Sequence, residues 1–154
     1  MSSIIETIID NIKAWTPVFD SDVSVGTLDI DEMPITLDVS DCPVRMFSVV
    51  DPKVNAEFAH IALGSTAGID WYILDRLYIL PAKMDEGLKG NNAKIIKYTA
   101  SYFEQARINR GVVTTATVKG VSVAPPYVRN WPDYEGGVPY YVVDCVVHIF
   151  EVIT

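Results

Sequence analysis

Few residues in this sequence have the type and setting that catalysis requires, and two aspartates are the best of them. Asp75 and Asp144 each lie inside an otherwise apolar, strand-like run, where a charge is costly unless it is paired. They are therefore candidate functional carboxylates. The alternative is a structural role, in which Arg76, a helix lysine or backbone donors at a subunit contact neutralise them. We favour the structural role.

The residues that could bind a metal ion are few and poorly spaced. None of them forms the Cys-x-x-Cys or His-x-x-x-His pair that is typical of zinc sites. The histidine between Val147 and Ile149 lies in a strand-like run, where a core or barely exposed histidine is expected. The two cysteines are far apart in apolar runs, and we expect reduced core thiols rather than a disulfide. The whole set is His60, His148, Cys42 and Cys145.

Phosphate-binding and nucleophile motifs are not found either. Gly64 and Gly68 lack the lysine and hydroxyl of a P-loop, and Gly136-Gly137 precedes a strand rather than a helix. The sequence contains no nucleophile elbow. It therefore predicts no catalytic residue, no cofactor and no enzymatic activity.

A proline-rich, aromatic segment between residues 124 and 139 has a different character. Its four prolines reduce the conformational freedom that a loop loses on docking. Tryptophan, tyrosine and arginine are the residue types that anchor protein interfaces. A loop packed on its own domain is the alternative, but we favour an interface because so many large side chains would otherwise face solvent. The candidate interface residues are Tyr127, Arg129, Trp131, Tyr134 and Tyr140.

The charge of the chain is unevenly distributed. The net charge of −8 lies wholly in residues 1–57, which hold eleven acids against three bases, while the rest of the chain is balanced. A protein that grips nucleic acid needs a basic face to displace counterions, and no basic block is present. The acids either keep the protein soluble or form a wall that faces a polyanion without binding it. The candidate wall residues are Asp20, Asp22, Asp29, Asp31 and Glu32, with Asp38 and Asp41 in the same base-free stretch.

Two amphipathic helices are predicted. The first follows the capping-box spacing of Ser3 and Glu6 and ends before Pro17. The second covers residues 92–109 and ends at Gly111, which suits a C-terminal cap. Their inward-facing residues recur at helical spacing. These are Ile4, Ile5, Ile8, Ile9, Ile12 and Trp15 in the first helix, and Ile95, Thr99, Tyr102 and Ala106 in the second.

Strand-like runs dominate the rest of the chain. Residues 69–80 form the clearest strand and carry apolar side chains on both faces. This pattern predicts a strand that is covered on both sides, by helices or by a neighbouring subunit. The other β-like segments are 35–50 (with a break at 41–43), 112–124 and 140–153. The segments expected to form turns, loops or a short helix are 16–34, 55–63 and 83–91.

Length and composition predict one α+β domain over residues 1–154. With 49% hydrophobic and 21% charged residues, the chain suits a globular domain that has its own core. No repeat, linker or low-complexity tract divides it, and no apolar run reaches the length of a membrane span. We expect a mostly antiparallel sheet flanked by the two helices, with a long hairpin-like loop at 124–139.

The order of these elements resembles a known family. Four segments carry the resemblance: the helix SIIETIIDNIKAW, the strand IDWYILDRLYILPA, the helix AKIIKYTASYFEQARI and the closing strand GGVPYYVVDCVVHIFEVI. Together they resemble the tail terminator and neck proteins of long-tailed bacteriophages. The resemblance spans nearly the whole chain and rests on the order, length and character of the elements.

The resemblance implies a structural virion protein. Members of this family typically form a ring, commonly a hexamer, that caps the tail tube, stops its growth and joins the head connector. DNA passes through the ring without specific binding, and no cofactor is involved. The implied partners are the tail tube protein and the head connector or adaptor proteins, without a membrane. The implied location is the tail or neck of the virion, after assembly in the host cytoplasm.

Two alternatives to this function remain. One is another phage morphogenesis part, such as a head-completion protein, a tail adaptor or a tail chaperone. The other is an unrelated small binding module or enzyme.

Overall fold

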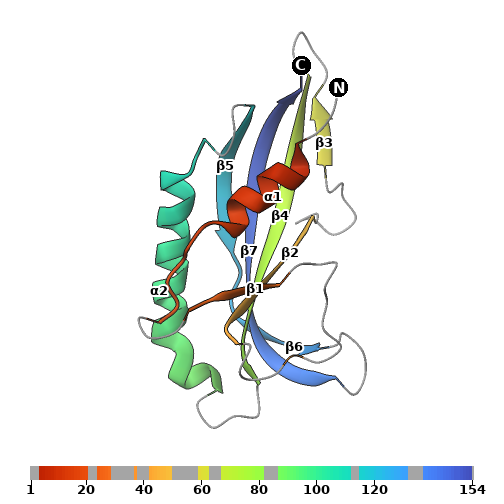
Figure 1. Cartoon of the computed structure of the whole chain (residues 1–154). Helices are drawn as coiled ribbons and strands as arrows, with labels where there is room; N and C mark the ends of the chain where they lie inside the picture. Colours follow the sequence, from red (N-terminus) through yellow and green to blue (C-terminus); the bar gives the residue numbers. More distant parts are fainter. Residues whose placement is uncertain are drawn as a thin grey trace.

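The longest strand of the computed structural model, β7 (Val138–Ile153), lies in the middle of its sheet (Figure 1). Along one side it pairs with β4 (Ala67–Pro81), and along the other with β5 (Ala116–Val123) and β6 (Tyr127–Trp131). All three pairings are antiparallel. The β-branched, apolar sequence of β7 suits a central strand, which is enclosed by neighbours on both edges.

The remaining strands extend the sheet beyond β4. Strand β2 (Val44–Val49) pairs with the second half of β4 and β3 (Ala59–Ala62) with its first half, both antiparallel. Strand β1 (Gly26–Leu28) adds to β2 in parallel. With helices α1 (Ile5–Lys13) and α2 (Gly87–Ile108), these strands form one α+β domain, which confirms the predicted fold class.

The structure describes residues 4–20, 24–28, 37, 42–49, 59–62, 67–81, 87–111, 115–131 and 137–153. Several residues singled out from the sequence lie outside these ranges. They are Ser3, Asp22, Asp29, Asp31, Glu32, Asp38, Asp41, Gly64, Tyr134 and Gly136.

The structure differs from the sequence predictions in several segments. Residues 59–62, predicted to be helix or loop, form β3 because β4 offers them a partner strand. Residues 127–131, predicted to be loop, form β6 on the edge of β7. Helix α2 begins at Gly87, so part of the predicted loop at 83–91 is helical. Strand β1 lies within the segment 16–34, which was predicted to be turn-like.

Strands β5 and β6 together form one arm of a long hairpin whose other arm is β7. The N–H of Ala124 donates to the carbonyl oxygen of Asp144 at 2.9 Å, which continues the pairing beyond the end of β5. Pro125 and Pro126 then interrupt the ladder, because proline has no N–H to donate. At its β6 end the hairpin curves away from α2 (Figure 1).

Both helices cover the same face of the sheet, and the main core lies beneath them (Figure 1). Alternation along β4 and β7 directs every second residue of each strand into this core. Its fully buried members include Ile8 and Ile12 of α1, Tyr98 and Tyr102 of α2, Ile73 and Leu77 of β4, and Val143, Cys145, Val147 and Ile149 of β7.

A smaller core lies on the opposite face, at the β6 end of the sheet. It joins residues of β2, β4, β6 and β7 with one residue that precedes β2 in the sequence. Its members are Leu37, Val44, Met46, Tyr78, Trp131, Tyr140 and Val142.

The N-terminus of α1 is capped by a residue from the other end of the chain. The buried carboxylate of Glu151, on β7, accepts the N–H of Ile4 at 3.0 Å and the indole N–H of Trp71 at 2.8 Å. Ile4 is the N-cap residue and forms no side-chain cap. A negative charge at the N-terminus of a helix also interacts favourably with the helix dipole. The predicted cap by Ser3 falls outside the described residues.

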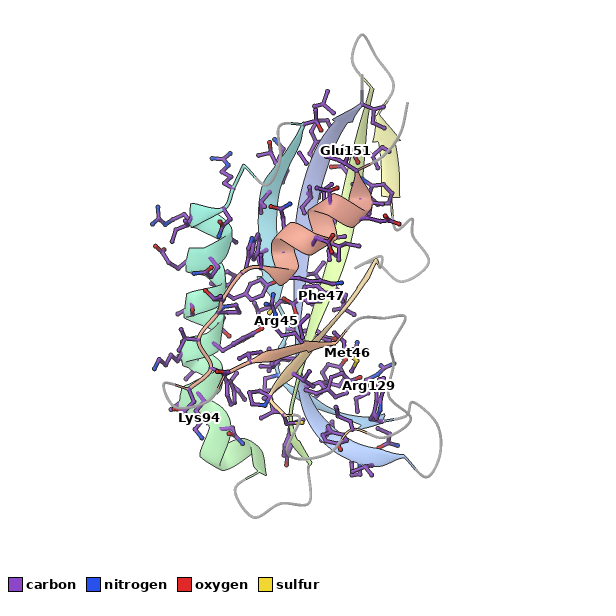
Figure 2. All side chains as sticks on the ribbon, in the orientation of Figure 1. Arg45, Met46, Phe47, Lys94, Arg129 and Glu151 are labelled. Carbon is purple, nitrogen blue, oxygen red and sulfur yellow. The ribbon has the colours of Figure 1, made fainter. Side chains whose placement is uncertain are left out.

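The C-terminus of α1 is held by a cation of the sheet. The guanidinium of Arg45, on β2, donates to the carbonyl oxygens of Ile12 at 3.1 Å and Trp15 at 2.8 Å. A positive charge is favourable at this end of a helix. Figure 2 shows Glu151 and Arg45 near opposite ends of α1, so the helix is fastened to the sheet at both ends.

Glu151→Gln should lower the free energy of unfolding by about 1–3 kcal/mol, because one of the two partly buried donors loses its hydrogen bond to this carboxylate. Urea unfolding followed by tryptophan fluorescence would measure the loss. Glu104→Gln, on the exposed surface of α2, is the matched control and should change stability little. Equal stability of the two variants would contradict a capping role for Glu151.

Candidate interaction surfaces

Two of the five predicted interface residues lie inside their own domain. Trp131 is 7% exposed and Tyr140 is 2% exposed. The ring of Trp131 packs edge-on against Tyr78 with 5.5 Å between centroids, and the hydroxyl of Tyr140 donates to the carbonyl oxygen of Leu37. The expectation that these side chains anchor a partner from a free loop is wrong, because Trp131 on β6 and Tyr140 on β7 both lie in the smaller core.

The other two described interface candidates are more accessible. Tyr127 is 36% exposed, and its hydroxyl donates to Asp144 at 2.7 Å. Partial burial raises the pKa of Tyr127, and the hydrogen bond to Asp144 and the charge of that carboxylate raise it further. Arg129 is half-buried on the same strand (Figure 2). Val128 and Val138, at 50% and 49% exposure, lie beside them on the hairpin.

Asp144 is paired across strands with Arg76. The two residues are direct register partners on β7 and β4, and their side chains meet at 2.7 and 3.1 Å. Burial acts to lower the pKa of Arg76, but the hydrogen bond and charge of Asp144 outweigh it and raise that pKa. Asp144 therefore has the structural role that we favoured.

Asp75 is paired with a cation that the sequence did not suggest. Arg45 donates to both carboxylate oxygens of Asp75, at 2.6–3.2 Å, and both side chains are almost fully buried. Burial acts to lower the pKa of Arg45, but the charge and hydrogen bonds of Asp75 raise it above its ordinary value. The pair joins β2 to β4, so Asp75 too has a structural role.

Aromatic side chains and a buried thiol surround this pair. Arg45 lies over the ring of Phe47, with 4.8 Å between the guanidinium carbon and the ring centroid. Burial raises the pKa of Tyr98 and Tyr102, and the charge of Asp75 raises them further. Burial also raises the pKa of the Cys145 thiol, which disfavours the reactive thiolate. Cys145 is buried and Cys42 is partly buried, and both are free cysteines in the structure.

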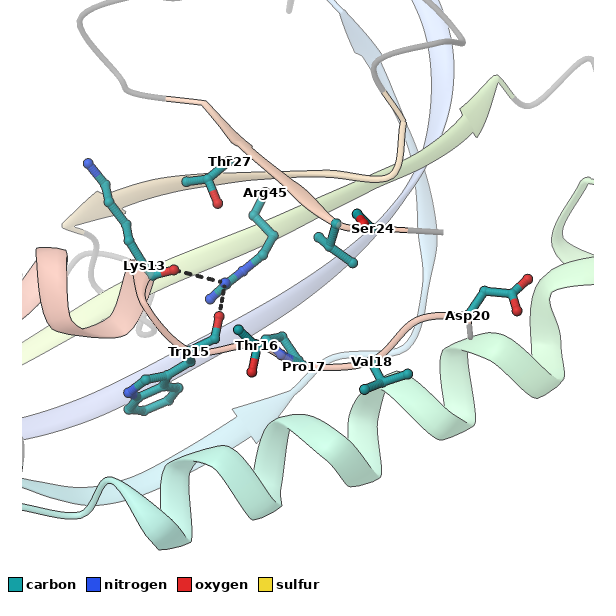
Figure 3. Close-up of a pocket in the computed structure, with 10 residues that line it drawn as sticks. Lys13, Trp15, Thr16, Pro17, Val18, Asp20, Ser24, Thr27 and Arg45 are labelled. Carbon is teal, nitrogen blue, oxygen red and sulfur yellow. Dashed lines mark hydrogen bonds between the residues drawn. The ribbon is translucent and has the colours of Figure 1, made fainter. Parts of the chain in front are cut away.

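A cavity of about 500 Å³ lies beside Arg45, between the end of α1 and strand β1 (Figure 3). All three side-chain nitrogens of Arg45 already donate hydrogen bonds, to Asp75 and to main-chain carbonyls. The guanidinium is thus not available to hold an anion in the cavity. The other lining residues are Lys13, Trp15, Thr16, Pro17, Val18, Asp20, Ser24, Val25 and Thr27.

Asp20 is the only one of the five predicted channel acids among the described residues. Its carboxylate pairs with the ammonium of Lys94 on α2 at 3.1 Å. This ion pair fastens the segment after α1 to α2, so Asp20 is not a free acid on an open wall. The acids Asp22, Asp29, Asp31 and Glu32 lie outside the described residues.

The face of the sheet opposite the helices is covered at one end only. The smaller core covers the β6 end, whereas no described element packs over the half-buried side chains farther along β4 and β7. We term this surface the open face. It consists of Asp70, Tyr72, Leu74 and Arg76 of β4, and Asp144, Val146, His148 and Phe150 of β7.

A stacked histidine lies in the middle of the open face. The imidazole of His148 packs on the ring of Tyr72, with 4.7 Å between centroids and 14° between planes. Its Nε2 lies 2.7 Å from a carboxylate oxygen of Asp70. A shallow groove of about 250 Å³ runs beside Tyr72 and His148 to Gly120 and Ser122 of β5. His148 is therefore a half-exposed surface residue rather than a core histidine.

Helix α2 carries a second apolar surface on its outer side. Ile96, Phe103 and Ile108 are 70%, 45% and 62% exposed. Side chains of this size are the kind that interfaces cover. The register of α2 turns Ile96 and Phe103 toward solvent and buries Tyr98.

The described residues contain no group of three His, Cys, Asp or Glu side chains that could hold a metal ion. None of their helices is both long and apolar enough to cross a membrane. No protein-family model matches this chain, and no curated protein matches its sequence.

Proposed function

We propose that this chain is a structural subunit of a ring at the head–tail joint of a long-tailed bacteriophage. In this proposal the ring caps the tail tube and connects it to the head connector. The open face is the observation that carries the proposal. Strands β4 and β7 have apolar residues on both faces, and the two helices cover only one. Tyr72, Leu74 and Phe150 on the open face are the side chains that an assembly would cover.

The roles of the charged residues support assembly rather than chemistry. Asp75 and Asp144, the best candidates for functional carboxylates, are both occupied by arginines of neighbouring strands. The two apolar surfaces differ from each other, and they lie on opposite sides of the sheet. Contacts between unlike surfaces of identical subunits produce rings or filaments rather than two-fold dimers. The partners in this proposal are further copies of the chain, the tail tube protein and the head connector or adaptor proteins.

The purified protein should form a closed homo-oligomer, most simply a hexamer of the 17.1 kDa chain. Stable interfaces between identical chains should each bury more than about 1,000 Å². Native mass spectrometry would give the number of subunits, and negative-stain images would show whether the particle is a ring. A chain that stays monomeric, both in solution and in assembled tails, would refute the proposal.

The proposed ring should not bind DNA. The chain has a net charge of −8, and a lumen built from it would repel phosphate, so that DNA slides instead of binding. Fluorescence anisotropy with a labelled duplex at about 0.15 M salt, where the Debye length is about 8 Å, should show no measurable affinity. Tight binding that weakens steeply with salt would contradict this prediction.

A further inference from the structure

A groove of about 220 Å³ lies between the C-terminal half of α2 and strand β5. Its floor is apolar, and its rim carries cations from both elements. The apolar residues are Phe103 and Ala106 of α2 and Val118 and Val121 of β5, and the cations are Arg107, Arg110 and Lys119. Because β5 is the outermost strand on this side of the described sheet, the groove lies at the edge of the molecule.

Among the described residues, the charge of this groove is only partly neutralised. Arg107 forms an exposed pair with Glu104 at 2.6 Å, and Lys119 lies over the ring of Phe150, with its ammonium 5.5 Å from the centroid. No described carboxylate pairs with Arg110 or Lys119. An acidic surface is therefore the best electrostatic match for the groove.

The complementary charge lies on the outer face of α1. Glu6 and Asp10 are exposed there, four residues apart and hence on the same side of the helix. Lys13 lies 3.9 Å from Asp10, but its side chain is only 25% exposed, against 74% for Asp10. Helix α1 is fastened to its own sheet by Glu151 and Arg45, so it presents these acids outward.

We propose that the acidic outer face of α1 in one copy docks on the cation-rimmed groove between α2 and β5 in the next copy. This inference rests on the proposed ring and names the contact between its subunits. Phe103 in the groove, with Ile96 two turns earlier on the same side of the helix, supplies apolar area, and the charges set the orientation. The two surfaces are different parts of the chain, so repetition of the contact generates a head-to-tail arrangement that can close.

Charge reversal tests each side of this contact separately. One variant carries Arg110→Glu and Lys119→Glu, and a second carries Glu6→Lys and Asp10→Lys. All four side chains are exposed, so circular dichroism and melting curves should match those of the parent chain. Each variant should need about tenfold or more protein to assemble, as measured by light scattering after size exclusion, because like charges would then meet.

A third variant combines all four substitutions. It shows whether the two double variants fail because like charges meet at the contact or because the substitutions disrupt assembly in some other way. It brings opposite charges together again, so its assembly should return toward that of the parent chain. Lys97→Glu, on the exposed surface of α2 outside the groove, is the control for Arg110→Glu and should assemble normally.

The possible failures are distinguishable. Rings that form equally well in all variants, or a combined variant that stays dissociated, would overturn this contact while leaving the ring itself in place. A parent chain that never assembles would overturn the proposed function, and this contact with it.

Discussion

Replacing Arg45 by methionine should lower the free energy of unfolding by about 3–5 kcal/mol, because Asp75 would be left as an unpaired buried charge. The substitution also removes the donors that hold the carbonyl oxygens of Ile12 and Trp15 at the end of α1. Urea unfolding monitored by circular dichroism would measure the effect. The prediction concerns stability and not surface chemistry, because Arg45 is only 2% exposed.

Two further variants test the cause of this loss. Arg76→Met breaks the partly exposed pair with Asp144 and should cost about 1 kcal/mol or less. Arg45→Met combined with Asp75→Leu should be much less harmful than Arg45→Met alone, because no buried charge then remains unpaired. If the double variant is less stable than Arg45→Met alone, the unpaired carboxylate of Asp75 is not the main cause of the destabilisation.

Trp131→Ala should destabilise the domain by about 3–5 kcal/mol, the range for removing a buried aromatic side chain. The change would empty the centre of the smaller core, where Trp131 contacts Tyr78. Thermal and urea unfolding would both report it. Val128→Ala, on the same strand but 50% exposed, is the matched control and should be nearly neutral.

The outcome for Trp131→Ala also separates two interpretations of the hairpin. A variant with normal stability that fails only in assembly would show that Trp131 anchors a partner, as the sequence first suggested. A variant that unfolds at lower urea, with assembly lost only as a consequence, would agree with the structure.

Local patterns in the sequence predicted the long elements, in which apolar residues recur at a regular spacing. Strand β4 was predicted with both faces apolar, and both helices were predicted from residues at helical spacing. β3 and β6 were missed because their sequences are short and their strand form depends on partners far away in the chain. Gly87 and Gly90 made the first turn of α2 look like a loop, since glycine is a poor helix former.

The candidate surfaces were less predictable than the fold. Proline and aromatic content drew attention to the segment 124–139, but composition alone does not determine which way each side chain points. The strand register turns Trp131 and Tyr140 inward and leaves Tyr127 and Val128 accessible. The open face could be found only once β4 and β7 were aligned, because His148 lies far in sequence from Asp70 and Tyr72. The buried role of Arg45 could not be predicted from the residues around it, because its hydrogen-bond partners lie on α1 and β4.

The central position of β7 has a consequence for how the protein is made. Strands β4 and β5 do not pair with each other in the described sheet, and each depends on β7, which leaves the ribosome after both. At ordinary translation rates, the edge of β4 that faces β7 stays without its partner for on the order of ten seconds, although β2 and β3, which pair with its other edge, are already made. The nascent chain therefore exposes an unpaired, aggregation-prone edge throughout that interval. Its yield in cells should depend on chaperones that shield such edges until β7 emerges.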